Sequence, residues 1–447
     1  MIGILKRIFG GDTPAAEPQA ETHSTQSKGG QYDYVVVGAG PAGVQAVEHL
    51  RKQDATASIL LVGGEPEPPY SRMAIPYLLI GKVSEDGTYL RRDENHYEAL
   101  NIEYRHGLVQ KVDAEASALN MTDGSTISYG KLCLATGASP IKPPIPGLDN
   151  KGVHHCWTLE DARKIIDLAH EGAHVVLMGA GFIGCIILEA LALRKVNLTV
   201  VEMGDRMVPR MLNPTCGGLL KKYCNTHGVT VHTSTKITMV EPNPGDPEDT
   251  LLVDLDNGEQ IPAHLLVVAA GVRSNTAFLE GSAVEVDEGI KVDEHLQTAV
   301  SNIYAAGDVA QGPDFSTGGW SVHAIQPTAS DHGRIAALNM VGKETPYQGS
   351  LVMNVLDTLG LISASFGLWE GVPGGDSVER LDEENYKYIR LEFDGDILVG
   401  AQTLGRTDHI GVLRGLIQNR KPLGVWKERL KEDPHRIMDA YVALSQM

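Results

Sequence analysis

Hydrophobic and polar positions along the chain predict the same strand–helix–strand unit twice. A short apolar run, typical of a strand buried on both faces, is followed each time by a glycine-rich turn and a stretch with helical periodicity. The predicted strand, helix and returning strand lie at residues 34–37, 41–53 and 59–62 in the first unit and at 174–178, 182–195 and 198–202 in the second. Such units predict an α/β protein with parallel, doubly wound sheets.

The pattern changes after residue 345. The predicted elements are now strands at 386–392 and 397–404, joined by a turn at Asp394-Gly395, and helices at 410–419 and 422–431. We therefore expect residues 346–447 to form a separate α+β domain.

The first 31 residues differ from the rest of the chain. Residues 11–31 are rich in Pro, Ala, Ser, Thr and Gln, which predicts a disordered linker. Residues 1–10 place apolar side chains at helical spacing beside Lys6 and Arg7. A decapeptide is too short for a stable helix in water. Either it folds against a membrane surface or a partner's groove, or it is an unstructured start with chance apolar residues.

Composition argues against several classes of function. The formal net charge of −19 disfavours nucleic-acid binding, so bound phosphates must be held by backbone N–H groups and helix ends. None of the five cysteines forms a CxxC pair, which argues against a zinc ribbon or a thioredoxin-type site, and scattered thiols fit a reducing cytoplasm. Adjacent residues such as His154-His155-Cys156 rarely converge on one ion, so no metal site is predicted. Without a signal peptide or membrane span, we expect a soluble, cytoplasmic protein.

The first predicted helix opens in the turn Gly38-Ala39-Gly40-Pro41-Ala42-Gly43. The first glycine permits the tight turn, the second lets a pyrophosphate approach the backbone, and the third lets the helix pack on the strand. Glu65 follows 22 positions after the last glycine, where a ribose hydroxyl needs an acceptor. A turn of purely structural use is the alternative.

The same arrangement recurs at Gly179-Ala180-Gly181-Phe182-Ile183-Gly184. Glu202 ends the next predicted strand, 18 positions on, and would accept a bond from a ribose 2′-hydroxyl but repel a 2′-phosphate. This favours NADH over NADPH. Arg206 is either a phosphate contact, which would favour NADPH, or an ordinary surface arginine. Two dinucleotide sites in one chain suggest hydride passing between two cofactors.

Further motifs carry a family resemblance: Tyr70-Ser71-Arg72, Leu134-Ala135-Thr136-Gly137, Ala269-Ala270-Gly271 and Ile303-Tyr304-Ala305-Ala306-Gly307-Asp308. With the two glycine turns, the chain resembles the FAD-dependent pyridine nucleotide oxidoreductases, above all rubredoxin reductases, oxygenase-coupled ferredoxin reductases and the flavin portion of NADH-dependent nitrite reductases. The likeness runs from Tyr32 to about Gly342, and more faintly to the C-terminus.

The resemblance implies a fold in which an NAD domain is inserted into a split FAD domain, followed by an interface domain. In this chain we expect a tail and linker at 1–31, the FAD domain at 32–150 and 273–345, the NAD(P) domain at 151–272 and the interface domain at 346–447.

The resemblance also implies roles for single residues. Asp308 would accept hydrogen bonds from the FAD ribityl chain, residues 135–137 would approach FAD with their backbone, and Arg72 would lie near the FAD phosphates or ring edge. Trp320, with Gln326, either belongs to a stretch passing the isoalloxazine or is an ordinary half-buried aromatic residue. The expected cofactor-binding residues are Gly38, Gly40, Pro41, Ala42, Gly43, Glu65, Arg72, Ala135, Thr136, Gly137, Gly179, Gly181, Ile183, Gly184, Glu202, Gly271, Gly307, Asp308 and Trp320.

Three departures from the family matter for the chemistry. Met73 stands where disulfide-reducing and peroxide-reducing relatives carry a cysteine, so no thiolate is available there. Tyr77 and Ile186 replace a lysine and a glutamate that pair beside flavin and nicotinamide in ferredoxin reductases. Glu189, one helical turn further, either substitutes for that glutamate or is an exposed helix residue.

We therefore predict an enzyme in which NADH reduces FAD and reduced FAD passes electrons to a downstream acceptor, with a rubredoxin-, ferredoxin- or reductase-like protein as the expected partner. The chemistry is centred on the flavin, with no separate catalytic side chain. The alternatives are a flavin-dependent quinone or small-molecule reductase and a weakly catalytic flavin-binding sensor or scaffold. A homodimer and peripheral membrane contact through residues 1–10 are further hypotheses.

Overall fold

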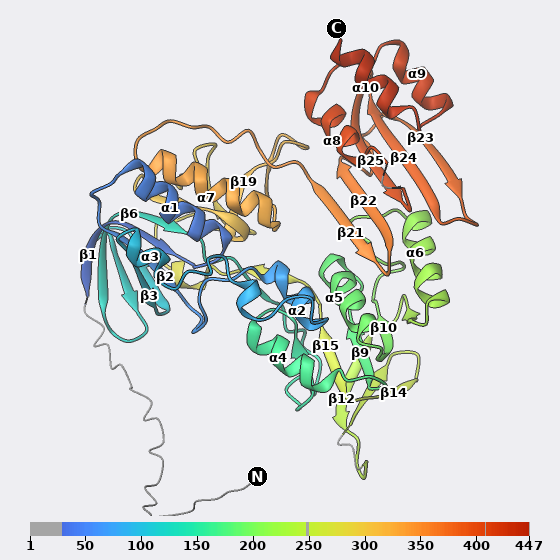
Figure 1. Ribbon diagram of the computed structural model, residues 1–447, viewed down its shortest axis with the longest axis horizontal. Coiled ribbons are helices and arrows are strands. Elements are labelled where there is room, and N and C mark those ends of the chain that lie inside the picture. The colour runs from blue at the N-terminus through green and yellow to red at the C-terminus, as the bar shows by residue number, and fades with distance from the viewer. Residues whose placement is uncertain (1–28, 247–249, 407, 447) are drawn as a thin grey trace, which may run out of the picture.

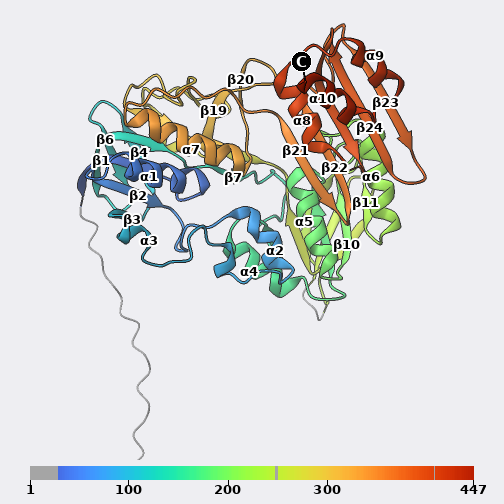
Figure 2. The same ribbon diagram turned by 45° about the horizontal axis from the view of Figure 1, so that its top comes forward.

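The computed structural model describes residues 29–246, 250–406 and 408–446 of the chain, so the predictions for residues 1–28 lie outside the described residues. Figure 1 shows three units, which we name the first, second and C-terminal units. Each is built on its own main sheet. Figure 2 shows from a second direction that the C-terminal unit adjoins the second unit.

The first unit contains a seven-stranded sheet with the order β3-β2-β1-β6-β5-β4, to which β18 is added beside β6. Its strands are β1 (Gly30–Val37), β2 (Ile59–Gly63), β3 (Ile102–His106), β4 (Val109–Asp113), β5 (Ala118–Met121), β6 (Thr126–Leu134) and β18 (Ile303–Ala305), and its helices are α1 (Pro41–Gln53), α3 (His96–Ala99) and α7 (Gln326–Met340). Because β18 pairs in parallel with the end of β6, a late segment of the chain completes this early sheet. Helices α1 and α7 lie side by side over it (Figure 1).

The second unit contains a five-stranded parallel sheet with the order β11-β10-β9-β15-β8. Its strands are β8 (Val153–His155), β9 (His174–Met178), β10 (Asn197–Val201), β11 (Thr230–His232) and β15 (Leu265–Val268), its helices are α4 (Leu159–Leu168), α5 (Phe182–Leu193) and α6 (Pro214–Thr226), and an antiparallel sheet is formed by β12 (Ile237–Pro242), β13 (Leu251–Leu255) and β14 (Gln260–Ala263). The three central strands β10, β9 and β15 are largely apolar because the helices cover one face of the sheet and the small sheet covers the other.

Two short strands lie where the chain passes between the first two units. β7 (Ala138–Pro140) leaves the first unit and β16 (Val272–Ser274) returns to it, and the two pair antiparallel. The short helix α2 (Ile75–Leu79) extends from the first unit and packs its buried side chains into the core of the second. A small sheet of β17 (Ile290–Lys291), β19 (Ala310–Pro313) and β20 (Trp320–Val322) precedes α7.

The C-terminal unit is an antiparallel sheet with the order β21-β22-β25-β24-β23. Its elements are β21 (Met353–Thr358), β22 (Leu361–Gly367), β23 (Asp376–Asp382), β24 (Lys387–Asp394), β25 (Ile397–Leu404), α8 (Ile410–Asn419), α9 (Val425–Glu432) and α10 (Ile437–Ser445). Alternating side chains divide the sheet between two cores. One face packs on α8 to α10, and Leu356, Leu361, Tyr388 and Leu404 of the other face join the core of the second unit.

Several predicted boundaries were wrong. β1 begins at Gly30, inside the predicted linker 11–31, because Gly30 and Gln31 pair with the distant strand β6. Helix α5 ends at Leu193 rather than at residue 195, and Lys195 adopts a left-handed conformation. Helix α9 begins at Val425 rather than at residue 422, after Gly424 with a φ of 56°. Helix α10 was not predicted. Among the described residues, no helix has the length and apolar character needed to cross a membrane.

Candidate cofactor sites

The first glycine turn joins β1 to α1 and forms an open cradle at the helix N-terminus. Gly38 has a φ of 113°, and a Cβ there would collide with the carbonyl oxygen of Ala135. A Cβ on Gly43 would collide with the carbonyl oxygen of Gly38, whereas a Cβ on Gly40 would meet no atom within 4 Å. No side chain caps α1, so its first N–H groups are free to bind an anion. This geometry fits a pyrophosphate at Gly40, Pro41 and Ala42.

Asp308 lies beside this cradle. It follows β18 in a 3₁₀ turn that starts at Gly307, where a Cβ would come within 3.0 Å of the Ala42 side chain. Burial raises the pKa of Asp308 to about 6, although the charge of Arg72 acts in the opposite direction. Within the described part of the chain, its carboxylate accepts no hydrogen bond. A partly buried carboxylate without donors costs free energy, so this site fits a ligand that brings hydroxyl groups.

Arg72 and Glu65 form one cluster with two aromatic residues. The Arg72 guanidinium donates to Glu65 at 2.6 Å and to the carbonyl oxygen of Trp157 at 2.8 Å, and its carbon lies 5.4 Å from the ring centroid of Tyr70 and 5.3 Å from that of Trp157. The Tyr70 hydroxyl donates to the other oxygen of Glu65 at 2.5 Å. Both carboxylate oxygens of Glu65 therefore already hold one donor, and a ribose hydroxyl would have to share them.

Residues 135–137 lie at the passage between the first two units. Thr136 donates through Oγ1 to the carbonyl oxygen of Asn275 at 2.9 Å, and Asn275 donates through Nδ2 to the carbonyl oxygen of Thr136 at 2.9 Å. The Asn275 N–H donates to the Gly137 carbonyl oxygen at 2.9 Å. Sequence analysis missed Asn275, because its partner is 139 residues away and no local motif marks it.

The second glycine turn, between β9 and α5, repeats the geometry of the first. Gly179 has a φ of 102°, and a Cβ there would meet the carbonyl oxygen of Ala269 at 2.5 Å. A Cβ on Gly184 would collide with the Gly179 carbonyl oxygen, and a Cβ on Gly181 would meet nothing within 4 Å. The N-terminus of α5, with Ile183 in its first turn, carries no side-chain cap. Gly271, with a φ of 102°, follows β15, the strand beside β9.

Glu202 is fixed at the mouth of the second turn. Its two carboxylate oxygens accept the N–H groups of Ala180 and Gly204, each at 2.7 Å. Arg206, in contrast, is bound within its own loop, where it donates to the carbonyl oxygens of Leu212 at 2.8 Å and Pro209 at 3.2 Å and to the carboxylate of Asp205 at 2.8 Å. These contacts support the interpretation of Arg206 as a structural residue and favour a dinucleotide with a free 2′-hydroxyl.

Residues 32–332 match the family described as pyridine nucleotide-disulphide oxidoreductase. The chain belongs to this family. A relative from Aromatoleum evansii, NADH-dependent phenylglyoxylate dehydrogenase subunit epsilon, is 31% identical over 405 residues, which cover 90% of this chain and 95% of the relative. Rubredoxin-NAD(+) reductase of Pseudomonas putida is 28% identical, covering 86% and 98%.

Solved structures agree with this family. The NAD-dependent persulfide reductase from A. fulgidus has a TM-score of 0.80 and 29% identity, covering 88% of this chain and 77% of that one. The putidaredoxin reductase–putidaredoxin complex, at 24% identity, shares the fold with a TM-score of 0.83. The predicted family, α/β fold and enzyme class are confirmed. The protein is an FAD-dependent NAD(P)H oxidoreductase with FAD and NADH as cofactors.

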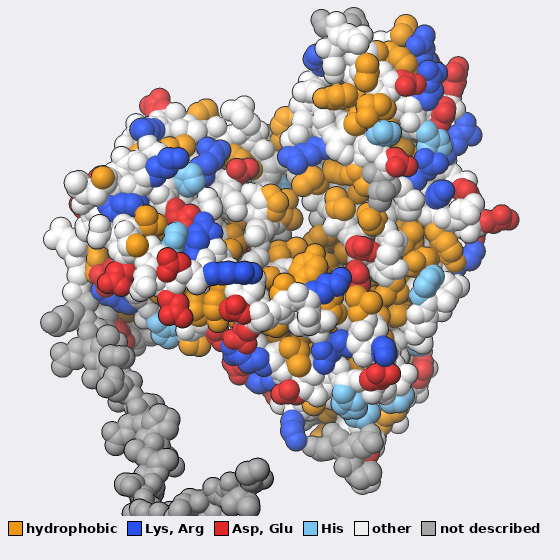
Figure 3. Space-filling model, in the orientation of Figure 1, with side chains coloured by type: hydrophobic (Ala, Val, Ile, Leu, Met, Phe, Trp, Pro, Cys, Tyr) orange, Lys and Arg blue, Asp and Glu red, His pale blue; other side chains and the backbone are white. Residues whose placement is uncertain are grey.

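Several large apolar side chains are exposed on the surface of the protein. Figure 3 shows hydrophobic side chains gathered in the middle of the molecule, over α2, α5 and β21. Met73, Tyr77 and Val355 are each about half exposed.

Glu189 lies on α5, and burial raises the pKa of its carboxyl group. The charge of Asp357 raises this pKa further, whereas the charge of Lys82 lowers it. Glu189 thus interacts with a lysine, but on a different turn of α5 from Ile186.

Trp320 is held by its indole N–H, which donates to the carbonyl oxygen of Val292 at 2.8 Å, and the residue is 55% exposed. At the start of α7, Gln326 accepts a hydrogen bond from Ser71 at 2.6 Å, which brings this helix end beside Arg72. The expectation that the stretch from Trp320 to Gln326 passes the isoalloxazine stays a prediction.

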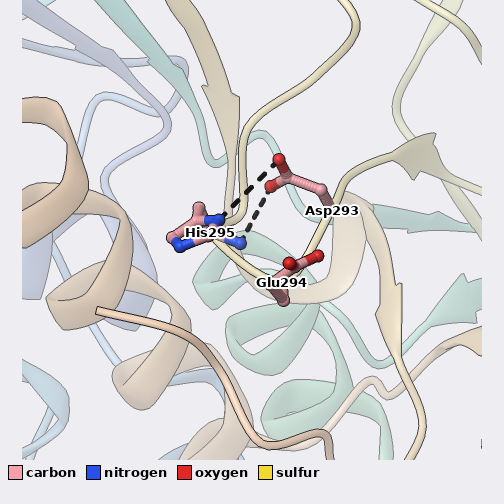
Figure 4. A group of neighbouring side chains, drawn as sticks. All are labelled: Asp293, Glu294 and His295. Atoms are coloured by element: carbon pink, nitrogen blue, oxygen red, sulfur yellow. Dashed lines mark hydrogen bonds and ion pairs between the residues drawn. The ribbon is translucent and has the colours of Figure 1, made fainter. Parts of the chain in front are cut away.

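One group of possible metal-ligating side chains was not singled out from the sequence. Figure 4 shows Asp293 linked to His295, with Glu294 beside them. The Asp293 carboxylate accepts the N–H groups of His295 at 2.8 Å and Gln297 at 3.0 Å, so it closes a surface turn. This turn accounts for the grouping without an ion.

Proposed function

We propose that the second glycine turn binds NADH, that the first binds FAD, and that electrons leave the flavin for a separate redox protein. The observation that carries this proposal is the pair of equivalent cradles. In each, the middle glycine, Gly40 or Gly181, faces open space at an uncapped helix N-terminus. Hydride transfer from nicotinamide to flavin is the chemistry that the two cofactors supply when bound. The protein binds and orients them.

The residues divide between the two cofactors as follows. For FAD, the backbone of the first turn holds the pyrophosphate, Asp308 accepts from hydroxyl groups, and the cluster of Arg72 and Glu65 supplies charge at the edge of the site. For NADH, the second turn holds the pyrophosphate and Glu202 accepts from the ribose. The proposed FAD residues are Gly38, Gly40, Pro41, Ala42, Gly43, Glu65, Arg72, Ala135, Thr136, Gly137, Gly307, Asp308 and Trp320, and the proposed NADH residues are Gly179, Gly181, Ile183, Gly184, Glu202 and Gly271.

The proposed domains follow from the sheets. The FAD domain comprises residues 32–150 and 273–345 and is extended at its start to Gly30. Its two segments belong together because β18 joins the sheet of the first segment and α7 packs against α1. The NAD domain comprises residues 151–272. The chain reaches this domain after β7 and leaves it through β16, and these two strands pair antiparallel between the domains. Residues 346–447 form the interface domain.

The proposed acceptor is a redox protein. The Aromatoleum evansii relative is named as one subunit of an NADH-dependent dehydrogenase, and this chain spans 95% of it. Other relatives are named as rubredoxin and ferredoxin reductases. Met73 offers no thiolate to take electrons from the flavin, which supports direct delivery to an external acceptor. The exposed apolar side chains Met73, Tyr77 and Val355 favour a second candidate, reduction of a quinone.

A comparison of acceptors tests this proposal. The FAD-loaded enzyme is reduced anaerobically with NADH and mixed with a rubredoxin, a ferredoxin or menadione, and reoxidation is followed at the flavin absorbance. We expect at least one protein carrier to give a higher kcat/KM than menadione. Efficient turnover with menadione and none with either carrier would favour the quinone reductase.

We also propose that the protein forms a homodimer and that residues 1–10 contact an anionic membrane surface at the cytoplasmic side. Light scattering tests the first. Flotation with anionic vesicles at low salt tests the second, comparing the full chain with one that begins at Gly29 and so keeps all of β1. Equal partitioning of both chains between vesicles and solution would contradict the proposed membrane contact.

A further inference from the structure

The loop from Glu202 to Asn213 connects β10 to α6 and holds both backbone groups of Ala180 in the second glycine turn. The Glu202 carboxylate accepts the Ala180 N–H at 2.7 Å, and the Val208 N–H donates to the Ala180 carbonyl oxygen at 2.8 Å. The position of this loop therefore decides how the carboxylate faces the turn.

The far end of the loop is bound to the C-terminal unit. Asn213 donates its backbone N–H to Gln402 Oε1 at 3.0 Å and its Nδ2 to the Tyr388 hydroxyl at 2.6 Å. Both acceptors are almost fully buried, and each has a further partner: Tyr388 donates to Glu379 at 2.7 Å, and Gln402 Nε2 donates to the Trp369 carbonyl oxygen at 3.1 Å. Asn213 is thus fixed to a rigid sheet.

The loop between these two ends has little freedom to absorb a displacement. Arg206 donates to the carbonyl oxygens of Leu212 and Pro209, and the Val208 carbonyl oxygen accepts the N–H groups of Met211 and Leu212, each at 2.9 Å. Val208 is buried and has a φ of 49°, a conformation that a β-branched residue adopts only when its surroundings enforce it. A shift at Asn213 would consequently move Val208 and Glu202.

We propose that Tyr388 and Gln402 are positioning residues for NADH: by holding Asn213, they fix the loop that places Glu202 at the second glycine turn. This inference rests on the proposed NADH site. It makes the C-terminal unit part of the dinucleotide specificity, although Tyr388 and Gln402 bond to the end of the loop opposite Glu202. Because coupling between two sites is reciprocal, bound NADH also strengthens the docking of this unit.

A matched pair of variants tests the inference. Tyr388→Phe removes the hydroxyl that holds Asn213. Tyr223→Phe also removes a hydroxyl that joins the second and C-terminal units, since Tyr223 donates to the Leu359 carbonyl oxygen at 3.0 Å, but it leaves the loop untouched. Calorimetry on the full, FAD-loaded chain measures Kd for NAD⁺ and NADP⁺. We expect Tyr388→Phe to weaken NAD⁺ binding about two- to tenfold, the effect of one hydrogen bond. NADP⁺ binding should change less, and Tyr223→Phe should match the wild type.

A third variant guards against misfolding of Tyr388→Phe. Asn213→Ser keeps a side chain that can cap α6, as Asn213 does through its bond from Cys216, but lacks Nδ2. Asn213→Ser should reduce the preference for NAD⁺ over NADP⁺, as Tyr388→Phe does. Unchanged NAD⁺ binding in both loop variants, or equal weakening in Tyr223→Phe, would overturn the inference. Failure of the wild type to bind NAD⁺ would contradict the proposed function itself and the inference with it.

Discussion

Arg72 donates to Glu65 at 2.6 Å while its guanidinium carbon lies 5.4 Å from the ring centroid of Tyr70 and 5.3 Å from that of Trp157. Trp157 belongs to the second unit, since it directly precedes Thr158, the N-cap of α4. The charge of Arg72 also acts on Asp308 beside the first glycine turn. One side chain therefore touches both units and acts on the proposed FAD site. Lysine lacks the planar guanidinium fork that lets Arg72 donate to several acceptors while it contacts two aromatic rings.

Arg72→Lys should weaken FAD binding about tenfold, which corresponds to about 1.4 kcal/mol, because lysine cannot keep the three hydrogen bonds and both ring contacts of Arg72. Fluorescence titration of the FAD-free protein with FAD measures the change. The control is Arg91→Lys, which also breaks an arginine–glutamate pair in the first unit, the bidentate pair of Arg91 with Glu48. If the two variants lose the same affinity, Arg72 has no special role at the cofactor.

Glu202→Ala should reduce the preference for NADH over NADPH by about 1–3 kcal/mol, because the variant loses a charge-assisted hydrogen bond to the ribose and also the repulsion of a 2′-phosphate. Steady-state kcat/KM with each dinucleotide gives the difference. Glu202→Gln, which keeps one acceptor oxygen without the charge, should fall between the wild type and Glu202→Ala. A wild-type enzyme that prefers NADPH would show that Arg206 governs the choice.

Local pattern predicted the first and second units well. The bounds of α1 and β9 agree with the prediction, as do those of β25 and α8 in the C-terminal unit. Both glycine turns have the expected geometry, because strand, turn and helix follow one another directly in the chain. Long-range partners could not be predicted. The pairing of β18 with β6, the bonds between Thr136 and Asn275, and the contact of Asn213 with Tyr388 join segments more than 130 residues apart. No local signal marks such partners.

Asp308 predicts a pH dependence in the protein freed of FAD. Burial raises its pKa from 3.8 to about 6 in the folded state. The folded chain then binds more protons than the unfolded chain between about pH 4 and 6, so the free energy of unfolding falls as the pH rises through this window. Two pKa units correspond to about 3 kcal/mol. Urea unfolding should show this fall, and Asp308→Asn should lack it. Identical pH profiles for the wild type and Asp308→Asn would show that another group causes the pH dependence.

Met73 predicts that the enzyme stores electrons on the flavin alone. The five cysteines are free thiols, and burial raises the pKa of Cys133 and Cys156 to about 12, so neither supplies a thiolate at neutral pH. Anaerobic titration with dithionite should consume two electrons per FAD and show no thiolate-to-flavin charge-transfer band. An uptake of four electrons per FAD would reveal a redox-active disulfide that the present account excludes.

Substitutions in the two glycine cradles test whether one chain holds FAD at the first turn and NADH at the second. A Cβ on Gly40 or on Gly181 meets no protein atom within 4 Å. A variant with valine at either position should therefore fold normally and lose only the binding of the dinucleotide at that turn. The measurement is anaerobic stopped-flow absorbance of the flavin after mixing with NADH. Gly40→Val should be isolated colourless, whereas Gly181→Val should be yellow, stay yellow with NADH and bleach with dithionite. A yellow Gly40→Val, or a Gly181→Val whose flavin NADH reduces at the wild-type rate, would contradict the assignment.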